Sequence, residues 1–230
     1  MQDAVTHIGR SLLSPLPSPP SSRTDLVFDK IKEAIVDKTL APGSRVTAAA
    51  LAVQLNVSRT PVRDVLLRLK HIGLVVPSGD GLRVIEPSRT AIRDAYELRA
   101  GIERSAAFYA AQRVSTPDIA ALLSAAEQAL RAAVEGDGPG FRQWDHEFHA
   151  TVARAAGNPM TEAAVADALL LTSVLRERDL SPSEGTVGCA QEHIEIAQAI
   201  SDGKSDLAAS AMDAHIQHVA AVVVASFPPV

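Results

Sequence analysis

The first third of the chain repeats apolar residues at the three- and four-residue spacing of helices, with polar breaks between the repeats. The first predicted helix begins at a capping Thr24 and stops before the turn at residues 40–43. The second is capped by Thr47 and ended by Asn56, which tolerates a left-handed backbone, and the third closes at Gly73. The pattern therefore predicts three helices, the last two joined by a tight turn.

After the third helix the pattern changes. Two short apolar runs, residues 74–76 and 82–85, flank the Gly-containing residues 78–81. This arrangement is typical of a two-stranded hairpin with a flexible tip. A helix-turn-helix followed by such a hairpin predicts a winged helix-turn-helix.

From about residue 87 the chain has almost no strand signals. Six amphipathic segments, separated by Ser, Gly and Pro, predict helices over residues 89–113, 117–135, 139–156, 159–179, 187–202 and 204–225. The Gly-rich loop at residues 136–140 lacks the following Lys and Ser or Thr of a phosphate cradle, so it connects helices. The expected fold class is mainly α, with an N-terminal winged helix-turn-helix domain and a C-terminal all-helical bundle of about six helices.

The start of the chain has a different composition. Residues 11–22 contain four prolines and five serines, which keep the backbone extended and offer little to bury. We expect residues 1–22 to form a disordered arm, residues 23–86 the winged domain and residues 87–230 the all-helical domain.

The formal net charge of −5 hides an asymmetry along the 230 residues. Residues 23–86 contain ten Lys and Arg against seven acids, whereas residues 87–230 contain eleven against nineteen. In the third helix the apolar face is formed by Val62, Val65, Leu66 and Leu69, and the other side carries Arg59, Arg63, Arg68 and Lys70 against the single acid Asp64. This excess favours a polyanion such as DNA, with a solvated surface helix as the alternative.

The single cysteine, Cys189, rules out an internal disulfide and fits a reducing compartment. We expect no apolar run to span a bilayer, and residues 1–10 lack the charged-then-apolar order of a secretory signal. The sequence thus predicts a cytoplasmic protein with no membrane partner.

Four polar residues fall on apolar helix faces of the second domain. Asp145 and His149 are one helical turn apart and can converge on one point, while His193 and His215 each lie among inward-facing apolar residues. A lone His in such a place is usually a satisfied core residue, which is the alternative here. A divalent cation would satisfy all four at once, and imidazole and carboxylate ligands suit Zn, Ni, Fe or Mn. We expect Zn.

Motifs of the first domain are similar to the winged helix of the GntR family of bacterial transcriptional regulators. The matching positions are Pro42-Gly43, Leu51-Ala52, residues 57–63 (Val-Ser-Arg-Thr-Pro-Val-Arg), Leu69, Gly73-Leu74 and Gly81. The resemblance implies that Arg59, Thr60 and Arg63 contact double-stranded operator DNA, with Gly81 at the wing tip. Adding Ser58 of the motif and Arg45 gives the candidate DNA-binding set Arg45, Ser58, Arg59, Thr60, Arg63 and Gly81. Relatives often carry polar residues where this chain has alanines at 48–50, so one DNA contact is expected to be missing.

Motifs of the second domain resemble the ligand-sensing domain of the FadR subfamily of that family. They are Asp145-x-x-Phe148-His149, Ala156-Gly157-Asn158, Glu192-His193-x-x-Ile196 and Met212-x-x-His215. Many members bind a metal there through an Asp and three His, which helps to hold a small carboxylic acid effector. The resemblance therefore implies that Asp145, His149, His193 and His215 are metal ligands, with His218 as a second choice. A bundle of six helices is similar to the VanR-like branch.

Arg99 is the candidate for contacting the effector. It lies on the same helix face as Tyr96 and Glu103, from which its guanidinium could reach a carboxylate. An ion pair between Arg99 and Glu103 at the four-residue spacing is the alternative.

The sequence predicts a ligand-responsive repressor that binds an inverted-repeat operator as a homodimer through residues 23–86. Residues 87–230 would bind the effector and dimerise. A regulator that responds to the metal itself is one alternative. A metallohydrolase is another, but no His-Glu-x-x-His motif is present and an enzyme would not need a DNA reader.

Overall fold

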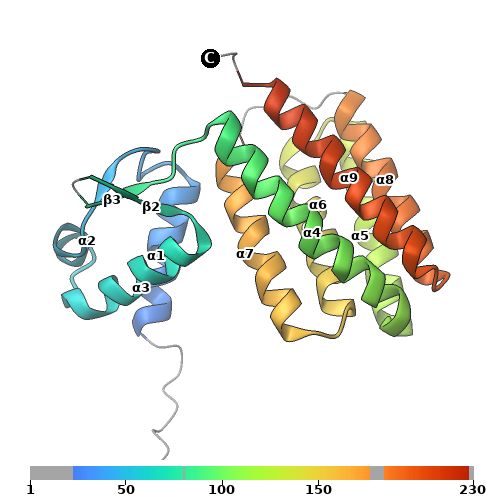
Figure 1. The fold of residues 1–230 in the computed structure, drawn as a ribbon, viewed down its shortest axis with the longest axis horizontal. Coiled ribbons are helices and arrows are strands. Elements are labelled where there is room, and N and C mark those ends of the chain that lie inside the picture. Colours follow the sequence, from blue (N-terminus) through green and yellow to red (C-terminus); the bar gives the residue numbers. More distant parts are fainter. Residues whose placement is uncertain (1–22, 80, 177–183, 228–230) are drawn as a thin grey trace, which may run out of the picture.

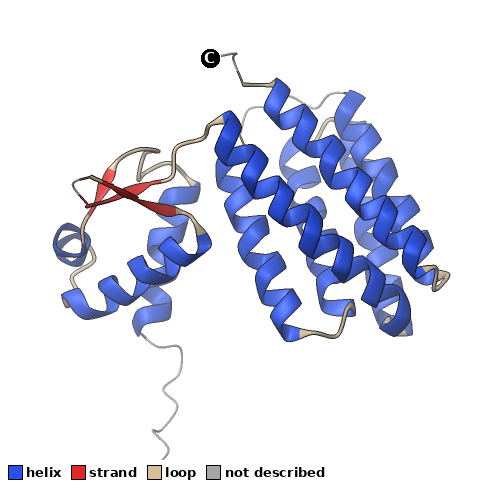
Figure 2. Ribbon diagram, in the orientation of Figure 1, coloured by secondary structure: helices blue, strands red, loops and turns tan. Residues whose placement is uncertain are grey.

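The computed structural model of the chain describes residues 23–79, 81–176 and 184–227, so the expected arm of residues 1–22 lies outside the described residues. Figure 1 shows a small N-terminal part beside a larger bundle of long helices. Figure 2 shows that the strands belong to the small part and that the larger part is helical. The expected fold class is confirmed.

The N-terminal part follows the predicted order of elements. Its helices and strands are α1 (Arg23–Val36), β1 (Arg45–Val46), α2 (Ala48–Gln54), α3 (Arg59–Ile72), β2 (Val75–Ser78) and β3 (Gly81–Val84). Residues from α1, α3 and the sheet form one apolar core, in which Val62, Val65 and Leu69 of α3 are fully buried.

Local signals explain most of these helix ends. The Thr47 hydroxyl accepts a hydrogen bond from the amide of Ala50 at 3.2 Å and so caps α2. Asn56 has φ of 50° and Gly73 has φ of 90°, the left-handed conformations that end helices. Ser58 precedes α3 without a side-chain capping bond. The expected cap at Thr24 was wrong, because α1 already includes Arg23, so that Thr24 lies inside it.

The sheet has one strand more than the predicted hairpin. Its order is β1-β3-β2 and both pairings are antiparallel, with Arg45 opposite Arg83 and Ser78 opposite Gly81. β1 has only two residues, too few for an alternating pattern to predict a strand. Pairing with β3 therefore defines it.

The bundle has six helices within the described ranges: α4 (Arg89–Arg113), α5 (Thr116–Glu135), α6 (Gly138–Ala155), α7 (Pro159–Leu175), α8 (Glu184–Ser201) and α9 (Ser205–Ala225). Hydroxyl or carboxamide groups of Ser88, Ser115 and Asn158, and the carboxylate of Asp137, cap four of them. Two boundaries differ from prediction by more than one residue. α8 begins three residues early, and α7 ends at Leu175 because Arg176 is extended, while residues 177–179 lie outside the described residues.

The central helix of the bundle is α4, which packs against α6, α7, α8 and α9. Its buried face is rich in alanine, including Ala106, Ala107 and Ala110, and these small side chains let the neighbouring helices approach closely. α7 also contacts α1 and α3 of the N-terminal part. Val174 near the end of α7 belongs to the apolar core of that part, and Leu170 and Leu171 pack against it.

The expectation that no segment could span a bilayer was wrong for α9, whose length and apolar composition would be enough to do so. The fold gives another reason for its apolar character. α9 packs along α4 and α8, and Ala208, Met212, Ile216 and Val219 are buried in the bundle. These four residues thus belong to the core, whereas Leu207 and Val222 of the same helix are exposed.

Candidate functional site

The first candidate site is the outer surface of α3. Arg59, Thr60 and Arg63 are exposed at its first turns, while Val62 and Val65 are buried beneath them. Arg68 is also exposed, but its guanidinium carbon lies 3.7 Å from the centre of the Phe28 ring on α1, so it helps to fix α3 against α1. The N-terminal half of α3 therefore presents two cations and a hydroxyl to solvent.

The sheet brings Arg45 and Gly81 together, although they are far apart in sequence. A Cβ atom added to Gly81 would lie 3.8 Å from Arg45 Nε, and Gly81 has φ of 141°, which other residues rarely adopt. Arg83 supports the wing from within, donating to Ser78 Oγ at 3.2 Å and to the Gly43 carbonyl at 3.1 Å. Arg45 and the wing tip thus form one exposed basic edge.

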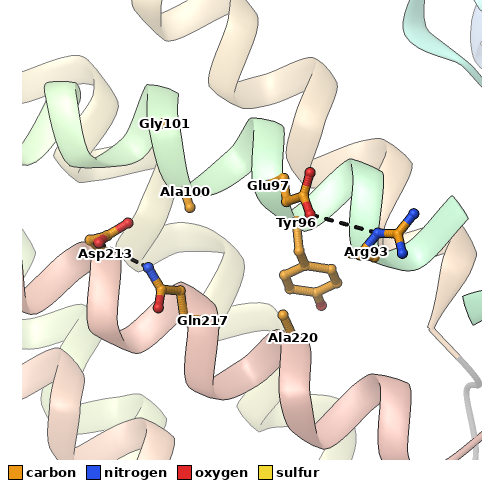
Figure 3. A pocket seen from close by; sticks show the side chains of 8 residues that line it. All are labelled: Arg93, Tyr96, Glu97, Ala100, Gly101, Asp213, Gln217 and Ala220. Atoms are coloured by element: carbon orange, nitrogen blue, oxygen red, sulfur yellow. Dashed lines mark hydrogen bonds and ion pairs between the residues drawn. The ribbon is translucent and has the colours of Figure 1, made fainter. Parts of the chain in front are cut away.

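A pocket of about 440 Å³ lies on the bundle surface between α4 and α9 (Figure 3). It is lined by Arg93, Tyr96, Glu97, Ala100, Gly101, Asp213, Gln217 and Ala220. Four of its polar residues pair with each other: Arg93 Nε lies 3.6 Å from Glu97 Oε1, and Gln217 donates to Asp213 at 3.0 Å. None of the predicted metal ligands lines this pocket.

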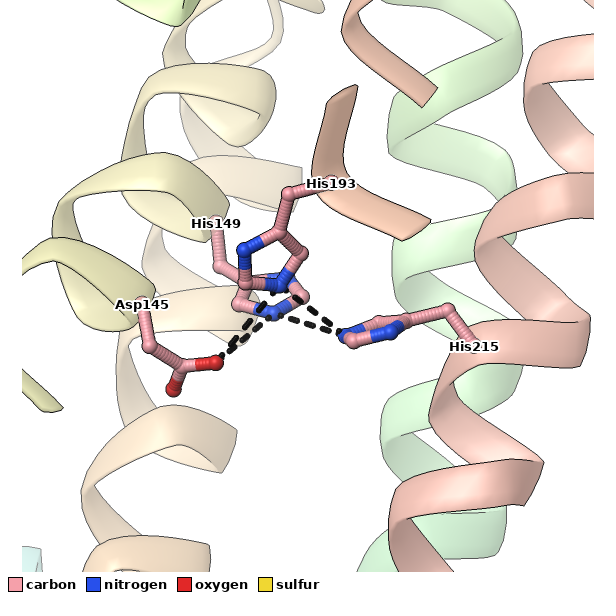
Figure 4. Close-up of side chains that lie close together, drawn as sticks. All are labelled: Asp145, His149, His193 and His215. Atoms are coloured by element: carbon pink, nitrogen blue, oxygen red, sulfur yellow. Dashed lines mark hydrogen bonds and ion pairs between the residues drawn. The ribbon is translucent and has the colours of Figure 1, made fainter. Parts of the chain in front are cut away.

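The second candidate site is a buried cluster of the four predicted metal ligands (Figure 4). α6 supplies Asp145 and His149, α8 supplies His193 and α9 supplies His215. One ligand atom from each residue lies within 4.8 Å of those from the other three. The Nε2 atom of His215 is 3.2 Å from His193 Nε2 and 3.4 Å from His149 Nε2. The Oδ1 atom of Asp145 is 3.6 Å from His193 Nε2 and 3.7 Å from His149 Nε2.

Two glutamates determine which ring nitrogen carries the proton in two of these histidines. Glu103 on α4 contacts His149 Nδ1, and Glu192 on α8 lies 2.7 Å from His215 Nδ1. A carboxylate accepts hydrogen bonds, so in neutral His149 and His215 the proton is on Nδ1 and the lone pair is on Nε2. These two Nε2 lone pairs then face each other inside the bundle.

This arrangement fits a metal ion. Facing lone pairs repel unless a cation lies between them, and the Nε2 atoms of His149 and His215 are only 3.4 Å apart. Three imidazole nitrogens and one carboxylate oxygen are ligands for Zn and its neighbours in the first transition row. Glu103 and Glu192 orient the imidazoles of His149 and His215 through their Nδ1 atoms. Carboxylates commonly orient metal-binding histidines in this way.

Electrostatics also favour deprotonated ligands. Burial lowers the pKa of His149 and that of His193 well below the usual value. Burial alone would raise the pKa of Asp145, but the Arg176 guanidinium and the neighbouring imidazoles outweigh it and hold the pKa of this carboxyl well below its usual range. His149, His193 and Asp145 are thus ready to coordinate a cation near neutral pH.

Arg99 and His218, also singled out from the sequence, lie outside the four-residue cluster. Arg99 is buried and its Nε donates to Glu103, so the alternative ion pair is present, but its Nη2 has no partner among the described residues. His218 is not part of the four-residue cluster. Its Nδ1 lies 2.7 Å from Glu192 Oε1, in a separate group with Cys189 and Glu192.

Sequence reasoning missed Arg176. Its Nε donates to Tyr96 Oη at 2.6 Å, and its Nη1 lies 3.7 Å from Asp145 Oδ2. Its segment was predicted to be helical, and nothing in the sequence indicated that its side chain meets Asp145, 31 positions earlier.

An exposed basic helix in a winged helix-turn-helix, joined to a helical bundle, defines the class of DNA-binding regulators. Residues 23–84 match the family described as bacterial regulatory proteins, gntR family, and residues 94–218 match the FCD domain. The chain therefore belongs to the GntR family of transcriptional regulators and carries an FCD domain. It is a regulator and not a hydrolase.

Individual relatives of this chain are transcriptional regulators as well. The Nta operon transcriptional regulator of Aminobacter aminovorans is 32% identical over 183 residues, covering 76% of this chain and 82% of the relative. The transcriptional repressor NanR of Salmonella newport is 28% identical over 244 residues, covering 96% and 92%. The structure of E. coli McbR/YncC has a TM-score of 0.72 at 20% identity, covering 91% of this chain and all of that one, and shows the shared fold. Membership of the VanR-like branch stays a prediction.

Proposed function

We propose that this regulator is a repressor that binds an inverted-repeat operator as a homodimer and is released when a small carboxylic acid binds at a metal in the bundle. Residues 23–86 would form its DNA-binding domain, and residues 87–230 its effector-binding and dimerisation domain. A regulator of transcription works where the DNA is, so we place it in the cytoplasm.

DNA recognition is proposed for Arg45, Ser58, Arg59, Thr60, Arg63 and Gly81. In support, Arg59, Thr60 and Arg63 share the exposed start of α3, and a helix presented in this way fits a major groove. Arg45 and Gly81 form the wing edge, where a cation can reach the backbone phosphates. One winged helix has a small footprint, so two copies on an inverted repeat would supply the affinity. Light scattering at micromolar concentration tests this, and a monomer would contradict it.

Asp145, His149, His193 and His215 would hold the metal, with Zn favoured over Ni, Fe and Mn. A divalent ion in this cluster would offer a carboxylate an open coordination position. Arg99 supports the choice of a carboxylate, because its buried Nη2 lacks a partner among the described residues. The effector would thus be held by the metal and by Arg99.

α7 supplies a physical connection between the proposed effector site and the DNA-binding domain. Arg176 directly after α7 lies beside Asp145, and Val174, two residues before it, is packed in the core of the N-terminal part. An effector that fits only one position of this helix end would favour one placement of α3. A changed separation of two recognition helices would misalign one of them with its half-site.

The observation that carries this proposal is the convergence of three histidine Nε2 atoms and one carboxylate oxygen. The test is operator binding by the zinc-loaded chain during titration with small carboxylic acids, using operator DNA selected from genomic fragments. We expect release by at least one acid and none by the same acid when the zinc has been removed. Release that needs no zinc would contradict the proposed role of the metal.

A metal-responsive regulator is the second candidate, since all four cluster residues are buried and an ion bound there could change the packing of the bundle by itself. The same titration separates the two. If zinc alone changes operator affinity and no acid adds to the change, the metal itself is the signal.

A further inference from the structure

Arg176 is placed at the edge of the four-residue cluster by Tyr96. Its Nε donates to Tyr96 Oη at 2.6 Å, whereas its Nη1 is 3.7 Å from Asp145 Oδ2, which is longer than a hydrogen bond. The attraction to Asp145 is therefore electrostatic, and Tyr96 fixes the guanidinium through the Nε edge. The Nη end of the fork faces Asp145.

The cluster is most open on the side of Arg176. The side chains of His149 and His193 are 0% exposed and that of His215 is 1% exposed, whereas Asp145 is 10% and Arg176 is 19% exposed. Among the residues that the structure describes, a small molecule approaching from this side would meet the Arg176 guanidinium before the histidines.

Two cationic groups would lie at this edge once a divalent ion is bound, namely the ion and the Arg176 guanidinium, with the carboxylate of Asp145 beside both. Arg99 and Glu103 neutralise each other in their own ion pair, and Glu192 contacts His215 and His218. A ligand with two carboxylates could place one on the ion and one on the guanidinium, whereas a monocarboxylate could bind only one of these groups.

We propose that Arg176 is a second carboxylate-binding residue of this site and that it selects a dicarboxylic acid. One carboxylate would bind at the metal, and the other would accept two parallel hydrogen bonds from the Nη end of Arg176. This inference rests on the proposed function and specifies the chemical class of its effector.

The test is calorimetry on the full-length, zinc-loaded chain with malonate, succinate and glutarate against acetate, propionate and butyrate. In the wild type we expect at least one dicarboxylate to bind about 10- to 100-fold more tightly than every monocarboxylate, as for a charge-assisted hydrogen bond gained. Arg176→Gln should abolish this preference and keep one zinc per chain. Arg154→Gln on α6 is the matched control, because Arg154 is half exposed and the charge change is the same. It should keep the preference.

The outcomes separate the two proposals. Equal affinity of the wild type for both series, or an unchanged preference in Arg176→Gln, overturns the role of Arg176 and leaves a carboxylate effector standing. If the zinc-loaded wild type binds neither series, the carboxylate effector and the role of Arg176 both fall. If Arg176→Gln does not retain zinc, Arg176→Lys takes its place, since it keeps the charge but not the fork, and it should lose most of the preference.

Discussion

Glu103 on α4 contacts Nδ1 of His149 on α6 across the bundle and so leaves the lone pair of His149 on Nε2, facing the other two histidines. The same Glu103 accepts a hydrogen bond from Arg99. One buried carboxylate therefore links the proposed effector-binding arginine to a proposed metal ligand.

This contact predicts that Glu103→Gln weakens zinc binding. A carboxamide keeps the shape of the side chain but removes the negative charge that makes His149 Nε2 a stronger electron-pair donor to a cation. Changes of this kind typically cost about 10- to 100-fold in metal affinity. Competition with a chelator of known affinity measures the loss. Glu147→Gln on α6 is the control, because Glu147 is exposed and should leave the affinity unchanged.

The metal should stabilise the fold. Zinc at 100 times its dissociation constant is expected to add about 2.7 kcal/mol to the free energy of unfolding, because it binds the folded chain. His193→Ala and His215→Ala should abolish this gain, whereas His146→Ala, at an exposed position of α6, should keep it. Melting curves with and without zinc decide the matter. Equal melting temperatures for metal-free and zinc-loaded wild type would make these histidines ordinary core residues.

Arg63 is predicted to read a base. Arg63→Ala should cost about 1–3 kcal/mol at the operator and relax sequence preference there, because a cation bound only to phosphate would weaken binding to all DNA alike. Binding to operator and random DNA at fixed salt is the measurement. Lys30→Ala, which removes an exposed cation of α1, is the control and should change neither affinity much. Equal losses for Arg63→Ala on both DNAs would contradict base reading.

Acid should destabilise the zinc-free protein. The folded-state pKa of His149 and that of His193 are lowered by burial, while in the unfolded chain both titrate near the usual value of about 6.5. Below that pH the unfolded state binds more protons, so the free energy of unfolding falls by up to about 1.4 kcal/mol per pH unit for each histidine. Above about pH 7 these histidines are largely unprotonated in both states, so little of this stability is lost there.

Urea unfolding of zinc-free protein between pH 7.5 and 5, a range bracketing the usual histidine pKa of about 6.5, measures this slope. His193→Gln should reduce it, and the control His146→Ala should leave it unchanged. A stability that is flat across this range would show that the buried histidines do not govern the acid response.

Much of this protein follows from the sequence because helical periodicity and caps are local properties. The spacing of Val62, Val65 and Leu69 determined which side of α3 is buried and hence that Arg59 and Arg63 face solvent. The same periodicity placed Asp145, His149, His193 and His215 on inward faces, and all four are buried.

Only the tertiary structure decided what those side chains meet. Whether three imidazoles converge depends on the angles and offsets at which α6, α8 and α9 pack, which no single helix encodes. The Nδ1 contacts of Glu103 and Glu192 come from helices packed across the cluster, and Arg176 reaches Asp145 because α7 ends beside α6. β1 likewise exists as a strand because β3 lies next to it. The sequence by itself determined the helices and their buried faces, whereas strand β1 and the contacts between residues distant in the chain required the packed fold.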